Sequence, residues 1–521
     1  MDRNPISDLE AVAAMPGLEE LAAVIAQHVN PGKGFAGDPM SMLIFLAGRW
    51  AFGSANRFDS AVRSTDLWET LRYSAATVGR YLPERPPTYD QLRHLRAAAD
   101  DNLGSDLAHE FTAVAVLLAK QVGLLMPEVS ARWDRPSPTT VLHGDGSVFA
   151  PLSDVTVTLD NDGNTVVTGS RSHKLEKPRV GPTFKGKKGN ELLCGLPISV
   201  VGCHGRSPWQ RVLLGIDFFE DRNEIGSSLR LFERIIEEAA GGVTHVVYDR
   251  LMAGTHMRSL MKLGVLPVVP MPGSPIEGNH LKLPTVLQRV GFKSAGSEAK
   301  DKKISGKSKL VAPKERLILR YLQMASHETH LGTCNHELHA LDGAVISTAP
   351  GVTPTLDADY VQCLYIDWEI HADGYHPIGS LRVPCRAESF TVKIDFAGDR
   401  EGKNRGRDPY AIADWVRPVP EVAEYSAKIE GLRSDIESTF SWLKALLPSN
   451  RAGSLKAENF FLDVIGAGLL CNAIAWDVHY ALHTKCAQHE AELIRKRVLN
   501  SAAKAKKRAL AAEAAALRAR R

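Results

Sequence analysis

The hydrophobic pattern changes its period along the chain and divides it into segments. From about residue 38 to 126, apolar residues recur every three or four positions, which predicts helices. One of these helices is expected to begin at Thr88, because threonine caps helix starts and Gln91 follows three residues later. We therefore expect residues 1–130 to form a helical N-terminal domain, and the prolines between 127 and 139 to end it.

A different pattern follows the prolines. Short β-rich runs alternate with turn residues and are followed by an amphipathic helix over 225–240. The β-rich runs are 141–147, 155–159, 165–168, 193–203, 210–219, 243–249 and 265–269. The second and third flank Asn161-Asp162-Gly163-Asn164 and predict a hairpin, while the first is expected to end in the polar turn Asp145-Gly146-Ser147. Strands followed by helix, strand, helix and strand predict an α/β core over 138–270.

The last third of the chain holds two further kinds of segment. Residues 271–418 are rich in Gly, Pro, Lys and short β-like runs, which predicts a β-rich insertion subdomain. Helical spacing returns after Pro420, so we expect 419–485 to form the second part of the core, with a periodic helix and then an apolar helix. Residues 486–521 should form a basic helical tail, since the stretch from Arg495 onward has ten basic residues and one acidic residue.

Composition limits the class of protein. The 521 residues are 44% hydrophobic and 24% charged, as in ordinary globular chains, and the net charge is only +3, so any basic surface must be local. Seven scattered cysteines without a CxxC pair favour a reducing cytoplasm. The sequence MDRNPISDLE does not resemble a signal peptide, and the apolar stretch Val464–Trp476 is shorter than the roughly 20 residues that span a bilayer. We expect a cytoplasmic, nucleoid-associated protein without a membrane partner.

Three acidic residues stand where an α/β core can bring them together. Asp145 is expected at the end of the first core strand, Asp249 at the end of a later strand, and Glu437 on the periodic C-terminal helix. Carboxylates that converge at one edge of a sheet can hold divalent magnesium, which prefers oxygen ligands. Asp154 and Asp217 are rival acids, but we expect Asp217 to lie within a β-rich run.

The helix that carries Glu437 gives a geometric argument. At about 100° per residue, Arg433, Glu437 and Lys444 fall within about 40° of each other, directly beside the apolar stripe. A solvated face would more often place its charges opposite the stripe. An acid in this position can reach a metal ion at the rim of the sheet, while its basic neighbours can hold phosphates. Alternatively, Glu437 is only a salt-bridge partner of Arg433.

These motifs resemble the DDE transposases of bacterial insertion sequences, which have a ribonuclease-H-like fold. The chain has Asp145-Gly146-Ser147, Tyr248-Asp249-Arg250 and the spacing Arg433-x3-Glu437-x6-Lys444. A subgroup of the family has Tyr-x2-Arg-x3-Glu-x6-Lys and a β-rich insertion before the Glu helix, although Glu430 stands here at the Tyr position. The resemblance covers roughly residues 38–482. It implies a ribonuclease-H-like mixed sheet with flanking helices, interrupted by the β-rich insertion and preceded by the all-α domain.

The resemblance also implies an activity, namely magnesium-dependent cleavage of DNA and transfer of the cut strand into target DNA. Asp145, Asp249 and Glu437 would hold two Mg²⁺ ions, for which Mn²⁺ can substitute. The partners would be double-stranded DNA, at the transposon ends and the target, and a second copy of the chain in a homodimer. The N-terminal helices would serve DNA-end binding or dimerisation.

Besides the three acids, nine basic residues are expected to contact DNA phosphates. These residues are Arg433, Lys444, Arg250, Lys174, Lys177, Arg179, Lys185, Lys187 and Lys188. The lysine run from Lys300 to Lys309 is equally compatible with a surface loop.

Several alternatives remain open at the level of sequence. His327, His330, Cys334, His336 and His339 form a local cluster, but their spacing matches no standard zinc finger, and we favour ordinary residues of the β-rich insertion. Tyr365 and Trp368 could stack on an extruded base, but we favour core packing for both. The fold would also suit a domesticated DNA-binding protein without catalysis or a stand-alone metal-dependent nuclease.

Overall fold

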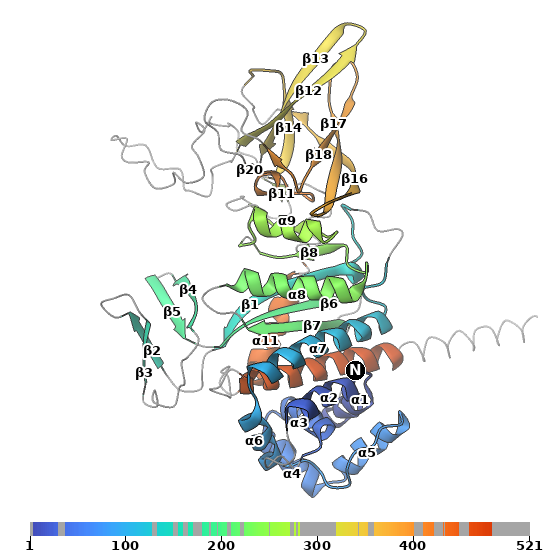
Figure 1. The fold of residues 1–521 in the computed structure, drawn as a ribbon, viewed down its shortest axis with the longest axis vertical. Helices are drawn as coiled ribbons and strands as arrows, with labels where there is room; N and C mark the ends of the chain where they lie inside the picture. The colour runs from blue at the N-terminus through green and yellow to red at the C-terminus, as the bar shows by residue number, and fades with distance from the viewer. Residues whose placement is uncertain are drawn as a thin grey trace, which may run out of the picture.

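The structure is a computed structural model. It describes residues 4–29, 37–127, 133–149, 155–159, 165–169, 180–186, 189–194, 196–205, 210–218, 223–249, 251–270, 276–277, 280–281, 319–341, 343–352, 359–400, 410–420, 431, 433–447 and 458–481. The molecule is elongated, with the N-terminal helices at one end, a mixed sheet in the middle and a β-rich region at the other end (Figure 1). The expected mixed α/β fold is confirmed at this level.

The elements of the N-terminal region are helices. They are α1 (Pro5–Ala14), α2 (Leu18–His28), α3 (Pro39–Ala51), α4 (Ala55–Ser64), α5 (Leu67–Thr77), α6 (Tyr89–Ala98) and α7 (Asp101–Gln121). The expected start of α6 is confirmed, because the Thr88 side chain accepts a hydrogen bond from the backbone N–H of Gln91, while the Gln91 side chain accepts one from the backbone N–H of Thr88. This capping box satisfies two backbone donors that the first helical turn would otherwise leave open.

The central sheet has five strands in the order β7-β6-β1-β8-β9. Their bounds are β1 (Val141–Phe149), β6 (Leu196–His204), β7 (Arg211–Phe218), β8 (His245–Val247) and β9 (Leu266–Val268). β1 pairs with β6, and β6 with β7, in antiparallel fashion, whereas β1 and β8, and β8 and β9, are parallel. The parallel pairs require crossovers, which α8 (Glu224–Ala239) and α9 (Gly254–Lys262) supply.

Helices cover both faces of this sheet (Figure 1). Along β1, alternate residues point to opposite faces. A Cβ atom built on Gly144 would meet the Phe232 ring of α8 at 2.6 Å, so Gly144 faces α8. Ser147, at the opposite parity, accepts a hydrogen bond from Lys444 of α11 (Arg433–Leu446), so the odd-numbered residues of β1 face α11.

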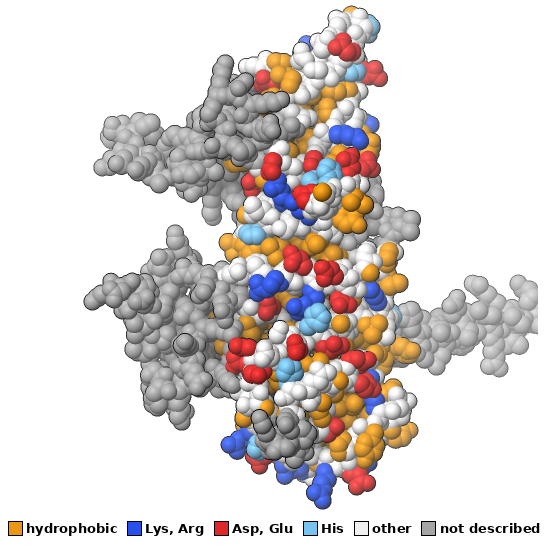
Figure 2. All heavy atoms as spheres, in the orientation of Figure 1, with side chains coloured by type: hydrophobic (Ala, Val, Ile, Leu, Met, Phe, Trp, Pro, Cys, Tyr) orange, Lys and Arg blue, Asp and Glu red, His pale blue; other side chains and the backbone are white. Residues whose placement is uncertain are grey.

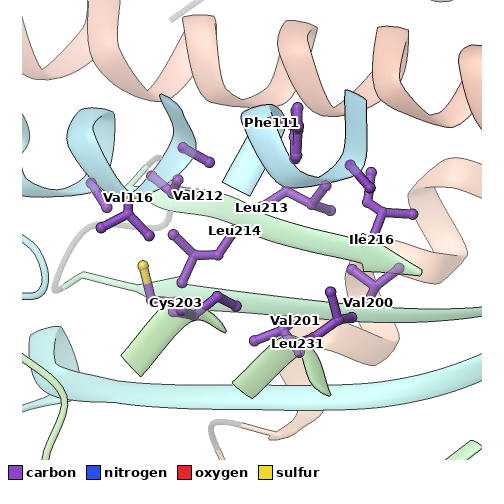
Figure 3. Close-up of a cluster of buried hydrophobic side chains, with 14 of the residues drawn as sticks. Phe111, Val116, Val200, Val201, Cys203, Val212, Leu213, Leu214, Ile216 and Leu231 are labelled. Atoms are coloured by element: carbon purple, nitrogen blue, oxygen red, sulfur yellow. The ribbon is translucent and has the colours of Figure 1, made fainter. Parts of the chain in front are cut away.

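Apolar side chains from the N-terminal helices and from the central sheet form one common core. In Figure 3, Phe111 and Val116 of α7 lie against Val212, Leu213 and Ile216 of β7, with residues of β6 beyond them. The predicted apolar helix near 457–482 is confirmed as Glu458–Ala481. It is long and apolar enough to cross a membrane by length and composition, but 78% of its apolar window is buried inside the protein.

The remaining strands form smaller antiparallel sheets. They comprise β2 (Val155–Leu159) with β3 (Thr165–Gly169), β4 (Val180–Gly186) with β5 (Gly189–Cys194), β10 (Ile276–Glu277) with β11 (His280–Leu281), and β19 (Asp399–Arg400) with β20 (Tyr410–Ala411). The predicted hairpin around residues 161–164 is confirmed by β2 and β3. Two larger sheets hold β12 (Leu319–Thr329), β13 (Gly332–Leu341), β14 (Ala344–Thr348) and β15 (Asp359–Tyr360), and then β16 (Gln362–His371), β17 (Gly374–Val383) and β18 (Phe390–Asp395).

Candidate functional site

Asp145 lies in the middle of β1 and faces α11. The expectation that Asp145 ends this strand is wrong, because β6 pairs along β1 as far as Phe149 and places Asp145 opposite Val200. Gly144 and Gly146 instead lie within the strand under α8: a Cβ atom at Gly144 would meet the Phe232 ring, and one at Gly146 would meet the Glu224 side chain. The Asp145 carboxylate also accepts a hydrogen bond of 2.9 Å from the backbone N–H of Gly146.

Asp249 follows β8 at the level of Asp145. The parallel register pairs His143 of β1 with Val247, the last residue of β8, so Asp145 and Asp249 each lie two residues further along neighbouring strands. The Asp249 carboxylate accepts a hydrogen bond of 2.8 Å from the backbone N–H of Leu251, which closes the turn that leads toward α9. This acid therefore follows its strand as expected, although the strand is shorter than the predicted run 243–249.

Glu437 lies on α11 and forms a salt bridge with Arg433, as the alternative interpretation of the sequence predicted. One Glu437 carboxylate oxygen is 2.9 Å from a guanidinium nitrogen of Arg433, and the Glu437 side chain is 52% exposed. The apolar stripe of the same helix is buried as predicted, at Ile436, Phe440 and Leu443. The described part of the helix begins near Arg433, so the predicted positions 422, 425 and 429 lie outside the described residues.

Lys444 reaches from α11 to the sheet. Its ammonium group donates a hydrogen bond of 2.8 Å to the hydroxyl of Ser147 and lies 5.4 Å from the centroid of the Phe149 ring. Burial lowers the pKa of Lys444, and the neighbouring carboxylate of Asp145 acts in the opposite direction. The Lys444 ammonium group is thus held on the face of β1 that carries Asp145.

The three predicted acids affect one another electrostatically. Burial raises the pKa of Asp145 to about 6, and the carboxylates of Asp249 and Glu437 add to this rise, while the Gly146 N–H and Arg433 oppose it. The carboxylates of Asp145, Asp249 and Glu437, which are more than 100 positions apart in the sequence, therefore lie close enough to interact electrostatically. A carboxyl group that is partly desolvated among other acids is a candidate ligand for a cation.

Sequence reasoning missed a fourth acid, Glu224, at the first residue of α8. Its carboxylate accepts a hydrogen bond of 2.9 Å from the hydroxyl of Tyr248, which is itself 3.0 Å from the hydroxyl of Ser228. Burial raises the pKa of Glu224 to about 7, and Asp145 and Asp249 contribute to this rise. In the sequence, Glu224 is an ordinary acidic residue of a first helical turn, and only the packing of α8 against Gly146 brings it to the site.

The donor set fits a divalent cation by chemistry, because carboxylate oxygens are the ligands that Mg²⁺ prefers. By position the fit is incomplete: within the described parts of the chain, no three His, Cys, Asp or Glu side chains are arranged to hold a metal ion. Asp249 is held by its turn and Glu437 by Arg433. The three residues are therefore a group of neighbouring acids and not a complete coordination shell. Because the Glu437 carboxylate is exposed, its side chain can change rotamer at small cost.

Several predicted DNA contacts cannot be placed. Arg250, Lys174, Lys177, Arg179, Lys187, Lys188 and the run Lys300–Lys309 lie outside the described residues. Of Lys185, the structure describes only the backbone, in β4. The described acidic and basic side chains on the α8 face are interspersed (Figure 2), whereas Arg433 and Lys444 lie on α11 at the other face.

Three further expectations concern residues outside this group of acids. The expectation that Tyr365 and Trp368 pack in a core is wrong, since these side chains of β16 are 48% and 38% exposed. Asp217 lies one residue from the end of β7 rather than in mid-run, and it bonds Arg230 and Ser227. The cluster His327–His339 is spread over β12, the turn and β13.

The sequence matches no protein-family model, and a comparison with curated proteins gives no significant match.

Proposed function

We propose that this chain is a DNA transposase, which cuts DNA and transfers the cut strand at the site formed by Asp145, Asp249 and Glu437. The observation that carries the proposal is the placement of Asp145 on β1 and of Asp249 two residues after the end of the neighbouring parallel strand β8, with the Glu437 helix packed beside them. Acids brought together in this way, with basic residues at their side, suit phosphoryl transfer, in which the protein mainly positions phosphates and neutralises charge.

The sheet topology supports a ribonuclease-H-like core as part of this proposal. Three antiparallel strands are extended by two parallel strands, and helices cover both faces. The first acid lies on the central strand β1 and the second follows the adjacent strand β8, and each of these strands has a neighbour on both sides. The third acid comes from a helix that follows the β-rich insertion in the sequence.

Asp145, Asp249 and Glu437 would hold the Mg²⁺ ions, while Glu224 lies on the α8 face of the sheet and interacts electrostatically with Asp145 and Asp249. When bound, Mg²⁺ would activate a water or a 3′-hydroxyl and neutralise charge on the scissile phosphate. Arg433 forms an ion pair with Glu437 in this structure. We therefore infer that Glu437 exchanges its partner on binding, which frees the Arg433 guanidinium for a DNA phosphate.

Lys444 would hold a second phosphate. Its hydrogen bond to Ser147 and its contact with Phe149 fix the ammonium group next to β1. Because this lysine is partly buried, its charge is weakly screened and should attract a phosphate more strongly than a fully exposed lysine would. DNA is accordingly expected on the α11 side of the sheet.

The test is a strand-transfer assay. Purified protein is mixed with DNA carrying the terminal repeats that flank the gene, a target plasmid and Mg²⁺, and joined products are separated on a gel. Asp249→Asn and Glu437→Gln should each reduce joining by about 100-fold or more while DNA binding persists, because removal of one preorganised electrostatic group has effects of this size. Asp217→Asn is the matched control, an acid of the same sheet outside this group, and should leave joining unchanged.

The outcomes separate the alternatives. Joined products that depend on Asp249 and Glu437 support the transposase. Cleavage without joining would indicate a nuclease instead, and binding without either reaction would indicate a DNA-binding protein. Full activity in Asp249→Asn would remove that residue from the site.

A further inference from the structure

Two cysteines of the β-rich region meet, one in β13 and one in the connection between β17 and β18. Cys334 lies in β13, opposite His327 of β12, and Cys385 lies two residues after the end of β17. Their side chains are hydrogen-bonded to each other, and both residues are partly exposed. The other three cysteines whose side chains are described are Cys203, Cys363 and Cys471.

Ring contacts hold the two segments together around this pair. The His327 ring stacks on the Phe390 ring, with centroids 4.8 Å apart and an interplanar angle of 6°, and the His336 ring lies 5.4 Å from the same phenylalanine. The tip of the β12–β13 hairpin is therefore packed on the connection between β17 and β18. The contact between Cys334 and Cys385 is part of this packing and is not an isolated approach of two loops.

A small molecule can reach this place. A cavity of about 360 Å³ lies between the hairpin tip and the β17–β18 connection. It is lined by His327, Glu328, Thr329, His330, Ala387 and Glu388. The last two residues are also those whose backbone N–H groups bind the sulfur of Cys385.

The two thiols have different surroundings. Backbone N–H groups of Ala387 and Glu388 donate to the Cys385 sulfur and lower the pKa of Cys385 below its usual value. The hydrogen bond to Cys385 raises the pKa of Cys334, since this thiol is the donor. Cys385 is thus the thiol of the pair that ionises more readily, and Cys334 lies next to it as its hydrogen-bond donor.

We propose that Cys334 and Cys385 are a modification site, which a hydroperoxide converts into a reversible disulfide between the two sheets. The thiolate sulfur of Cys385 attacks the O–O bond of hydrogen peroxide, which gives a sulfenic acid and releases hydroxide. The sulfur of Cys334 then attacks the sulfenic sulfur, the S–O bond breaks, and the leaving oxygen departs as water with the Cys334 proton. Two thiols and one peroxide give one disulfide and two waters, and a dithiol reductant reverses the change.

The experiment exposes the full-length reduced protein to hydrogen peroxide, blocks the remaining thiols by alkylation, and maps non-reduced peptides by mass spectrometry. The expected product is a peptide pair joined through Cys334 and Cys385, which dithiothreitol separates. Cys334→Ser should lose the cross-link and accumulate a dimedone-reactive sulfenic acid on Cys385. Cys385→Ser should lose both products.

The matched control is Cys363→Ser, at a partly exposed thiol of β16 that bonds the carbonyl of Tyr365. Burial raises the pKa of Cys363 to about 12, so Cys385 should react at least about 10-fold faster than Cys363. The control variant should form the Cys334–Cys385 cross-link as the unmodified protein does. Two thiols that remain alkylatable under peroxide, or a cross-link to a different cysteine, would overturn the proposal.

Discussion

A buried aspartate fixes the apolar helix Glu458–Ala481 to the N-terminal helices, and its removal provides a quantitative test of the fold. The Asp463 side chain is fully buried and forms ion pairs with Arg49 of α3 and Arg96 of α6. Its backbone carbonyl accepts a hydrogen bond from the indole N–H of Trp50. The substitution Asp463→Asn keeps the size of the side chain but removes the charge that two arginines share.

The expected effect is large because the arginines remain in place. Their side chains are 13% and 16% exposed, so Asp463→Asn leaves two mostly buried cations without their countercharge. Removal of one partner from a buried ion pair costs about 3–5 kcal/mol. At about 2–4 °C for each kcal/mol in a unit of this size, the melting temperature should fall on the order of 10 °C.

The assay is thermal unfolding followed by circular dichroism, with Asp90→Asn as the matched control. Asp90 pairs with Arg93 on the surface of α6 at 3.4 Å, and both side chains are mostly exposed, so the control should lose less than about 1 kcal/mol. If Asp463→Asn and Asp90→Asn melted at the same temperature, the proposed role of the buried pair would be refuted.

Two further predictions concern packing and pH. Gly144→Ala should destabilise the protein by about 1–3 kcal/mol in urea unfolding, because the new Cβ atom would lie 2.6 Å from the Phe232 ring; an unchanged midpoint would contradict the packing of α8 on β1. Burial lowers the pKa of His376, but its hydrogen bonds to Asp395 and Asp373 together raise the pKa by more than burial lowers it. The net shift of the pKa is therefore upward. The resulting stability is complete below the unfolded pKa of about 6.5 and is lost as pH rises through the higher folded value, so the melting temperature should fall as pH rises above about 6.5, and His376→Gln should flatten that fall.

Much of the secondary structure could be predicted because local periodicity and capping decide it. The amphipathic run 225–240 forms α8 almost residue for residue, and Thr88 caps α6 through the predicted capping box. The hairpin of β2 and β3 was predictable from its turn residues. In these cases the local preference and the tertiary structure favour the same conformation.

The errors arise where a distant partner decides the conformation. Gly146 indicated a turn because glycine is a turn former, but it lies within β1, where a Cβ atom would meet the Glu224 side chain of α8. Trp368 was expected in a core because large aromatic residues usually are buried, yet it lies on β16, at the edge of its sheet. Neither the packing of α8 nor the edge position of β16 can be inferred from neighbouring residues.

The candidate site was predictable only in part. Asp145, Asp249 and Glu437 were singled out by their order and context, and the structure gives them a common electrostatic field. Glu224 was missed, because its approach depends on how the first turn of α8 meets Gly146.

Iron-directed cleavage tests most directly whether three segments distant in the sequence bind the same divalent ions. Fe²⁺ replaces Mg²⁺ in the full-length protein with DNA bound, ascorbate generates radicals at the metal, and the cut positions in the chain are mapped. We predict cuts near Asp145, Asp249 and Glu437 together, all suppressed by excess Mg²⁺ and by the single substitution Asp145→Asn. Cuts at only one of these segments, or cuts that persist in Asp145→Asn, would contradict the shared site.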